Sequence, residues 1–293
     1  MWSFNRIARA VTLAVGLALM AFGVALAQES VHWSYEGDTG PEHWGELSPD
    51  YAACSQGVEQ SPVDIPANAP DNPTNIGFKY QPSAVNIFNN GHTVQVNYDQ
   101  GSSIVLDGTT YDLVQFHFHA ASEHEIGGAH DPMELHLVHK NAQGGLAVVG
   151  ILLKAGAENP AYAPVLQNLP PQESQPTPVA GATVDANALL PAQRDYWRYN
   201  GSLTTPPCTE GVKWLVMSTP VELSQAQIAA FTTIFQNNER PVQPLNARTF
   251  LVPTTLPATG GATVTLDAAL VGAGLLALVA GLALAHIGRR SAQ

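Results

Sequence analysis

Apolar and polar residues alternate over several short stretches of the chain, and this pattern predicts a protein built mainly of β-strands. The stretches are rich in β-branched and aromatic residues, which favour strands. They cover residues 85–88, 92–98, 103–106, 111–119, 133–139, 147–153 and 212–217. The dipeptides Asn90-Gly91, Asp107-Gly108 and Gly144-Gly145 lie between them and favour tight turns.

Three further stretches complete the predicted architecture. The run 146–153 is apolar throughout, as expected of a central strand covered on both faces. Residues 224–235 begin with Ser224 as a candidate N-cap and repeat apolar residues at helical spacing, which predicts a helix. Residues 156–193 are rich in Pro, Ala and Asn and predict a long surface excursion with some short helix. The expected fold class is therefore mainly β: a single domain on a large, mostly antiparallel central sheet with short peripheral helices.

The first 27 residues have the pattern of a signal peptide. Arg6 and Arg9 precede an apolar run, and this run ends in an Ala-Leu-Ala cleavage signature at residues 25–27. Cleavage there would leave Gln28 as the new N-terminus. The alternative is an N-terminal membrane anchor with the same hydrophobic pattern.

The other end of the chain predicts attachment to the cell surface. Residues 268–287 form an almost uncharged stretch of 20 residues, long enough at about 1.5 Å per residue to span a bilayer of roughly 30 Å. The basic tail 288–293 would stay cytoplasmic and leave the domain outside. Within the linker 252–267, the pentapeptide LPATG at 256–260 resembles a sortase sorting signal, which would join Thr259 to peptidoglycan. The alternative is an ordinary membrane-anchoring helix after the linker.

The remaining residues, 28–251, fit one domain. Residues 28–259 hold 8 Lys and Arg against 23 Asp and Glu, a net charge of −15. A surface this acidic argues against nucleic acid and anionic membrane as partners.

Histidines occupy alternate positions in two of the predicted strands. Side chains at i and i+2 project from the same face of a strand, so His117 and His119 point together. Glu134 and His136 share a face of the second strand in the same way. Two antiparallel neighbours of this kind can bring three imidazoles to one point and leave a fourth position open on a zinc ion, as in catalytic sites. A single histidine on a strand is usually a hydrogen-bonded or exposed residue that binds no metal, but three histidines in this pattern predict a metal site.

A cupin is the rival enzyme fold, because its metal motif also has H-x-H followed by Glu. His117, His119 and Glu123 fit that spacing. The glycines that the motif expects are replaced by Tyr111 and His130, and the second cupin motif is missing. The cupin interpretation is therefore disfavoured.

Polar residues around the histidines add candidate partners. Gln115 and Glu134 each precede a histidine by two residues, so each can accept the N–H of a ligand imidazole. Residues 199–208 place two threonines before two prolines, which predicts a rigid turn that presents hydroxyl groups.

Cys54 and Cys208 are the two cysteines of the chain. In an exported protein such a pair predicts a disulfide. A bond across 154 residues contributes nominally about 5 kcal/mol in the chain-entropy model. A two-cysteine metal site is the weaker interpretation, because the histidines already supply a full ligand set.

Taken in order, these motifs resemble the α-class carbonic anhydrases over residues 33–250, and the bacterial secreted branch in particular. The resemblance is carried by Gly40-Pro-Glu-His-Trp-Gly45, Glu59-Gln-Ser-Pro-Val-Asp-Ile65, Asn89-Asn-Gly-His92, Gln115-Phe-His-Phe-His119, Ser122-Glu-His124, Glu134-Leu-His-Leu-Val-His139, Gly201-Ser-Leu-Thr-Thr-Pro-Pro207 and Arg240-Pro-Val-Gln-Pro-Leu245. Several motifs in one order are more specific than any single motif.

The resemblance implies a role for each matched residue. His117, His119 and His136 would bind zinc, with Gln115 and Glu134 as partners of the first and last. Thr204 would be the gatekeeper and would donate to Glu123, and both Thr204 and Thr205 would contact the substrate. His92 would be the proton shuttle, beside a polar proton path formed by Tyr35, Asn90 and Gln95. An apolar substrate wall would be formed by Val138, Val148, Leu203 and Trp214, and His124 and His139 would be buried structural residues.

The implied activity is the reversible hydration of carbon dioxide to bicarbonate and a proton, that of a zinc hydro-lyase (carbonate dehydratase). Zinc-bound hydroxide would attack carbon dioxide, and His92 would relay the proton to solvent. Sulfonamides and anions are the expected inhibitors. The alternative is a catalytically inactive, carbonic-anhydrase-like surface binding module. Such modules usually lack a ligand histidine, whereas all three are present here together with Glu123 and Thr204.

Overall fold

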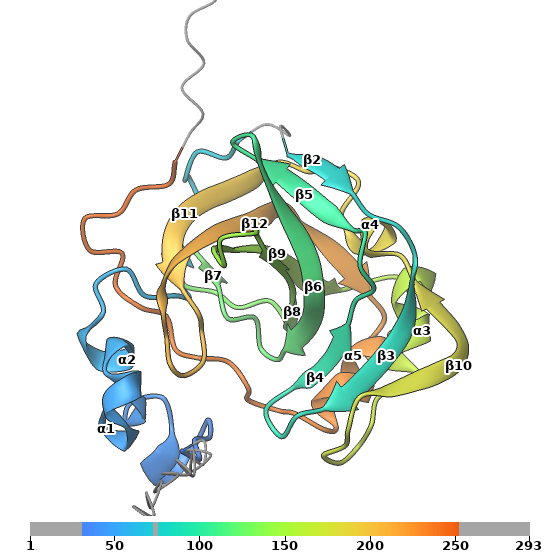
Figure 1. The fold of residues 1–293 in the computed structure, drawn as a ribbon, viewed down its shortest axis with the longest axis horizontal. Helices are drawn as coiled ribbons and strands as arrows, with labels where there is room; N and C mark the ends of the chain where they lie inside the picture. The colour runs from blue at the N-terminus through green and yellow to red at the C-terminus, as the bar shows by residue number, and fades with distance from the viewer. Residues whose placement is uncertain (1–30, 73–75, 252–293) are drawn as a thin grey trace, which may run out of the picture.

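Ten strands form one sheet at the centre of the computed structural model, which describes residues 31–72 and 76–251 (Figure 1). The strand order is β10-β3-β4-β6-β8-β9-β12-β11, and β2 joins through β5, which pairs with β6. The strands are β2 (Gly77–Lys79), β3 (Ser83–Asn89), β4 (Val94–Asn97), β5 (Ser103–Leu106), β6 (Thr109–His119), β8 (Met133–Lys140), β9 (Leu146–Ala155), β10 (Thr177–Val184), β11 (Tyr196–Ser202) and β12 (Glu210–Leu223). Strands β9 and β12 pair in parallel, and the other neighbours in this sheet are antiparallel. The predicted fold class is confirmed.

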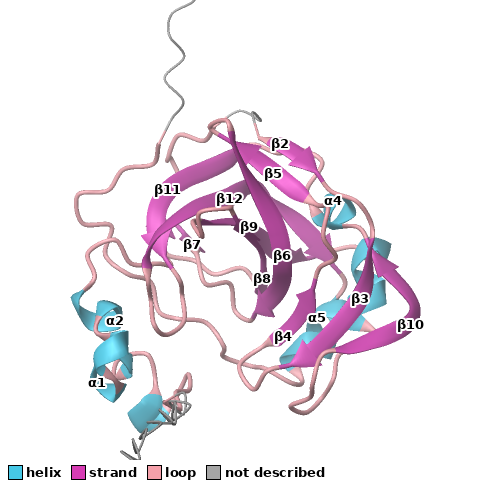
Figure 2. Ribbon diagram, in the orientation of Figure 1, coloured by secondary structure: helices cyan, strands magenta, loops and turns pink. Residues whose placement is uncertain are grey.

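Short helices lie around the outside of the central sheet (Figure 2), and two further short strands form a separate small sheet. The helices are α1 (Trp44–Leu47), α2 (Ala53–Gln56), α3 (Ala163–Leu166), α4 (Ala186–Leu189) and α5 (Gln225–Thr232), with 3-10 turns at Gly37–Thr39, Pro49–Tyr51 and Pro160–Tyr162. The second sheet pairs β1 (Asp64–Ile65) with β7 (Glu125–Ile126). Within the described part of the chain, no helix combines the length and apolar character needed to span a membrane. The predicted signal peptide, sorting-like motif, hydrophobic segment and basic tail lie outside the described residues.

Most of the predicted elements are present, with shifted ends. The apolar run 146–153 is the core of β9, which pairs with β8 and β12 and is buried over most of its length. The helix predicted over 224–235 is α5, which begins after Ser224 in a capping box with Gln227. The strand predicted from residue 92 begins two residues later, because the side chain of Asn90 accepts the backbone N–H of His92 and Thr93 in a turn.

Five strands were missed by the sequence pattern: the short strands β1, β2 and β7, and the longer strands β10 and β11. Residues 156–193 were predicted as a surface excursion with short helix, but they also contain β10, an edge strand whose residues are mostly exposed and include Pro178 and Gly181. Strand β11 contains the turn-type pair Asn200-Gly201. A Cβ at position 201 would collide with Ser61, so the glycine allows close packing there. Tertiary contacts, rather than local preference, make these segments strands.

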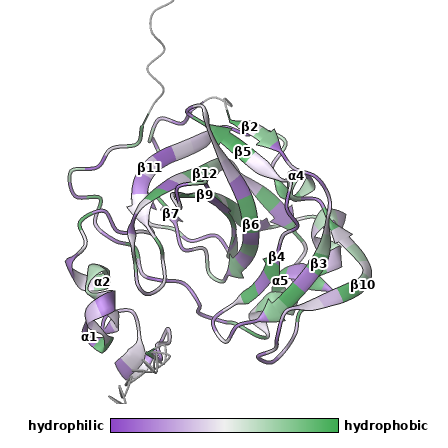
Figure 3. Cartoon of the chain, viewed as in Figure 1, coloured by the Kyte–Doolittle hydropathy of each residue, from purple (hydrophilic) through white to green (hydrophobic). Residues whose placement is uncertain are grey.

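Alternation along β6 and β8 gives the sheet two different faces, and Figure 3 shows hydrophobic and hydrophilic bands along β6. On one face Phe116, Phe118, Leu135 and Leu137 are fully buried in the main core. Helix α5 packs against this core through Phe231, whose ring centroid lies 5.7 Å from that of Phe118. The opposite face carries the histidines, so the core fixes the strands that position them.

The predicted disulfide between Cys54 and Cys208 is confirmed. It connects α2 with the threonine-proline loop that precedes β12. Trp44 of α1 packs in the same small cluster as the two cysteines. The bond therefore ties the N-terminal helices to the loop that carries Thr204.

Candidate metal centre

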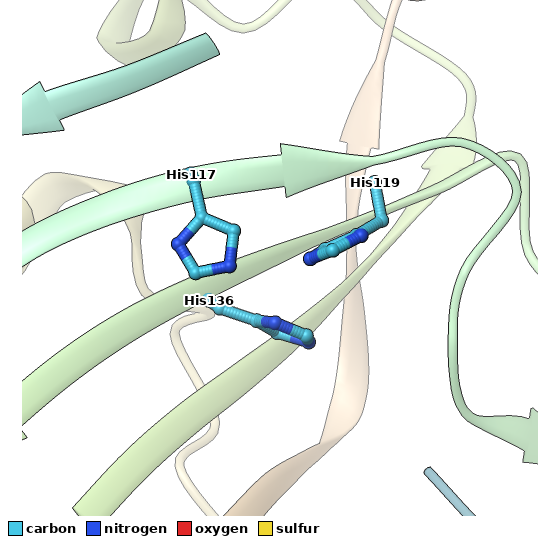
Figure 4. A group of neighbouring side chains, drawn as sticks. All are labelled: His117, His119 and His136. Atoms are coloured by element: carbon cyan, nitrogen blue, oxygen red, sulfur yellow. The ribbon is translucent and has the colours of Figure 1, made fainter. Parts of the chain in front are cut away.

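Three imidazoles meet on one face of the sheet, as the alternation predicted (Figure 4). In the β6–β8 register His117 lies opposite His136, and His119 lies opposite Glu134. The ring centroids are 5.0 Å apart for His117 and His119, 5.3 Å for His117 and His136, and 4.6 Å for His119 and His136. One nitrogen from each ring lies within 4.8 Å of the other two. This spacing can accommodate a single metal ion.

Each imidazole is oriented by a hydrogen bond from its other nitrogen. His117 Nδ1 lies 2.9 Å from Gln115 Oε1, His119 Nδ1 lies 2.7 Å from the Asn238 carbonyl oxygen, and His136 Nε2 lies 3.0 Å from Glu134 Oε1. Oxygens of these types only accept, so each of these nitrogens carries the proton. The nitrogens left with a lone pair are therefore Nε2 of His117, Nε2 of His119 and Nδ1 of His136.

The donor set fits zinc. Burial, followed by repulsion from the neighbouring imidazoles, lowers the pKa of His117 well below its usual value. Burial also lowers the pKa of His136, and it lowers that of His119 to about 4. All three rings are thus neutral near pH 7, as metal ligation requires. His119 Nε2 is buried without a hydrogen-bond partner, a cost that a bound metal would remove.

Glu134 organises the deepest part of the site. It is fully buried, and its Oε1 accepts both the His136 Nε2–H and the His124 Nδ1–H, the latter at 2.8 Å. Its Oε2 accepts the backbone N–H of His124. Burial works to raise the pKa of Glu134, but the interactions with His124 and His136 outweigh it, and the pKa lies well below the usual value. His124, Glu134 and His136 also approach one another closely enough to hold a metal, but these hydrogen bonds already engage them.

Glu123 is a second buried carboxylate on the same side of the site. Its Oε1 accepts the backbone N–H of Arg240 at 3.0 Å, and its Oε2 lies 3.8 Å from His136 Nδ1. Burial raises the pKa of Glu123 to about 7, although His136 and the Thr204 side chain oppose the shift. Thr204 therefore lies close to Glu123.

The residues of the implied substrate wall lie together in one apolar cluster. Val148 and Trp214 are buried in it, and Val138 and Leu203 pack against it. The Trp214 ring centroid lies 4.9 Å from that of His136, so the wall adjoins the metal centre. Thr205 is half-buried on the loop after Thr204, and its carbonyl accepts the N–H of Cys208.

The implied proton-path residues are more dispersed. His92 is half-buried, and its ring stacks on Trp33 with centroids 3.6 Å apart. Burial and the nearby carboxylate of Glu123 raise the pKa of Tyr35, so Tyr35 borders the site. Gln95 is paired opposite His117 and donates to Asn97. Asn90 is exposed, and its side-chain oxygen is engaged in its own turn.

Two further residues position the site and had no role in the sequence interpretation. Asn238 accepts the His119 Nδ1–H on its carbonyl, and its side chain donates to the carbonyls of Phe118 and His92. Arg240 is buried, and its guanidinium donates to Gln60 and to the carbonyls of Ser61 and Cys54. No spacing signal could identify Asn238, because it acts through a backbone carbonyl on a loop. Arg240 was visible only as the first residue of a matched motif.

Three neutral imidazoles on adjacent strands, each oriented by a hydrogen-bond acceptor, define a histidine metal centre of the kind found in catalytic zinc proteins.

Comparison with known proteins gives the family. The family described as eukaryotic-type carbonic anhydrase matches residues 39–253. A carbonic anhydrase of Pectobacterium carotovorum is 46% identical over 239 residues, which cover 80% of this chain and 97% of the relative. One from Nostoc sp. is 48% identical over 225 residues, which cover 75% of this chain and 85% of the relative. The structure of the α-carbonic anhydrase from Thermovibrio ammonificans in complex with the inhibitor sulfanilamide matches with a TM-score of 0.72 and 44% identity, over 75% of this chain and 98% of that one. The chain belongs to the α-class, or eukaryotic-type, carbonic anhydrase family.

Proposed function

We propose that the protein catalyses the zinc-dependent, reversible hydration of carbon dioxide to bicarbonate and a proton. The observation that carries the proposal is the convergence of His117, His119 and His136, with one free nitrogen from each ring within 4.8 Å of the others. Three protein ligands leave a zinc ion with a free coordination position, which distinguishes a catalytic site from a structural one.

The ligand residues and their partners would hold the ion in one geometry. Carbonic anhydrases are themselves the known case in which zinc lowers the pKa of its water to about 7, so the bound ion would supply hydroxide at neutral pH. Gln115, the Asn238 carbonyl and Glu134 would keep the three rings in the tautomers that leave Nε2, Nε2 and Nδ1 free.

Thr204 would orient the nucleophile. Glu123 is fixed by the Arg240 N–H and would accept from Thr204, which would leave the threonine oxygen as an acceptor toward the site. Carbon dioxide is apolar, so it would rest against the wall formed by Val138, Val148, Leu203 and Trp214. Thr205 would lie at the edge of this position.

His92 would carry the proton between the site and solvent. An imidazole is the side chain best suited to accept and release a proton near neutral pH. Its half-buried position at the rim supports this role. Tyr35 and Gln95, on the polar side, would help order the water between His92 and the metal centre.

Zinc analysis combined with stopped-flow hydration of carbon dioxide tests the proposal. Purified protein should contain about one zinc per chain, and its activity should be inhibited by sulfonamides; the Thermovibrio relative is described in complex with sulfanilamide. Anions should compete as well. Protein without zinc, or with zinc but without sulfonamide-sensitive activity, would instead indicate an inactive binding module.

We also propose that the enzyme acts outside the cytoplasm. The support is the sequence alone: a signal-peptide pattern at 1–27, a domain over 28–251, an LPATG motif at 256–260 and a hydrophobic segment at 268–287 before the basic tail. Mass spectrometry of the mature protein distinguishes the two modes of attachment. A C-terminus at Thr259 linked to wall peptide supports sorting, whereas an intact C-terminus in the membrane fraction supports a membrane anchor.

A further inference from the structure

A cleft of about 510 Å³ opens beside the turn that carries His92. One side consists of the end of β3 and the following turn, with Phe88, Asn89 and Asn90, and the other side consists of Glu173 and Ser174. The segment with Glu173 leads into β10 and belongs to the region that the sequence pattern did not resolve. The function proposed above assigns no role to the segment that carries Glu173.

Hydrogen bonds fasten this segment to the turn. The Ser174 N–H donates to the Asn89 carbonyl at 2.9 Å, and the Asn89 N–H donates to Ser174 Oγ at 3.2 Å. The Asn89 side-chain amide donates to the Pro170 carbonyl at 3.2 Å, and its Oδ1 accepts the Gly91 N–H. Hydrogen bonds at Pro170, before Glu173 in the chain, and at Ser174, after it, therefore fix the backbone around Glu173, although the Glu173 side chain is exposed.

The carboxylate of Glu173 lies directly against Gly91, the residue before His92. A Cβ at position 91 would collide with Glu173 Oε1, and Gly91 also has a φ of +88°, a conformation that favours glycine. The glycine thus allows both the turn and the close approach of the carboxylate. A negative charge is held at the backbone next to His92.

Charged groups reach His92 from two different segments. His32, on the exposed N-terminal segment, repels a proton on His92, and Glu173 attracts one. Burial of the ring, which stacks on Trp33, has the largest effect and lowers the pKa of His92. The charge of His32 adds to this shift, and Glu173 opposes it. Without Glu173, the ring would be a poorer proton acceptor.

We propose that Glu173 is a positioning residue for proton transfer: its carboxylate, held against Gly91, stabilises the protonated form of His92 at the rim of the site. This inference rests on the proposed function, because it assigns a use to the His92 relay. The proton leaves a donor in the site for an imidazole nitrogen of His92 and then passes to buffer, and Glu173 takes no direct part in the transfer.

Histidine-labelled protein followed by NMR during a pH titration tests the electrostatic part without any measurement of activity. The His92 signals are assigned by their loss in His92→Ala. Glu173→Gln should lower the pKa of His92 by about half a unit, as expected for one charge near a partly exposed site. Glu173→Asp should restore part of the shift, and Glu158→Gln, which removes an exposed carboxylate elsewhere, should leave the His92 pKa unchanged. An unchanged pKa in Glu173→Gln, or an equal drop in Glu158→Gln, would overturn the inference.

The kinetic part compares turnover in weak and strong buffer. Glu173→Gln should lower turnover by about threefold in weak buffer near pH 7, because the shift makes His92 a weaker acceptor, and should leave kcat/KM unchanged. If Glu173→Gln lowers the His92 pKa but turns over in weak buffer at the rate of the unmodified protein, the inference is also overturned. If the unmodified protein does not hydrate carbon dioxide at all, the proposed function fails, and the titration still shows whether Glu173 acts on His92.

Discussion

The histidine cluster and the proposed proton exit around His92 are built in different ways. His117, His119 and His136, which could hold a metal ion, lie on paired strands of the central sheet, and each has one nitrogen fixed by a buried or half-buried acceptor. His92 instead follows a turn, stacks on Trp33 of the N-terminal segment, and is influenced by His32 of that same segment and by Glu173 of a third segment. The first region is held by strand register, and the second by contacts among loops.

This difference matches the two chemical tasks. A metal site needs its donor atoms fixed within a fraction of an ångström, which packed strands provide. A proton shuttle must contact both the site and solvent, and a half-buried ring on a turn can do so. Substitutions of the three clustered histidines should therefore abolish carbon dioxide hydration, whereas substitutions around His92 should slow only the proton-transfer step.

The largest effect is expected from His119→Ala. Loss of one of three ligands should remove stoichiometric zinc and lower carbon dioxide hydration by at least about 10³-fold. Zinc analysis and stopped-flow assays measure both quantities, and His43→Ala, at a partly exposed histidine in the N-terminal segment, is the control. Retention of zinc and activity in His119→Ala would show that the cluster is not the metal site.

Glu134→Gln should have an intermediate effect, because it alters the support of the cluster and not a ligand. Glutamine has one acceptor oxygen in place of two and no charge, so it cannot serve His136 and both donors of His124. We expect zinc affinity to fall by about 10- to 100-fold in competition with a chelator. Glu222→Gln, at an exposed carboxylate of β12, is the matched control. Equal zinc affinities in the two variants would contradict this account of Glu134.

His92→Ala should have the smallest of the three effects and should affect the exit alone. Turnover in weak buffer should fall by about tenfold, because a positioned proton acceptor is lost, while kcat/KM and zinc content remain as in the unmodified protein. Added imidazole should restore part of the rate. Turnover at the unmodified rate in weak buffer would show that another group carries the proton.

The same contrast explains how much the sequence could predict. Alternation along β6 and β8 placed His117, His119 and His136 on one face, and the register confirms that they meet. The fold class and the disulfide were also predicted correctly. Each of these features depends on local periodicity or on a pair of rare residues, both of which can be read along the chain.

Features that depend on contacts between distant segments could not be read in this way. Asn238 orients His119 through a carbonyl group that every residue type possesses. Strand β11 forms although it contains Asn200-Gly201, because the glycine allows Ser61 to pack closely. Glu173 lies in a stretch rich in proline and polar residues, and only the fold places it beside His92.

Anomalous diffraction at the zinc edge, on crystals of zinc-loaded protein, tests the central claim most directly. One peak is expected per chain, at about 2.0–2.1 Å from Nε2 of His117, Nε2 of His119 and Nδ1 of His136. A peak among His124, Glu134 and His136, or the absence of a peak in zinc-loaded crystals, would contradict the assignment of the three histidines as the metal centre.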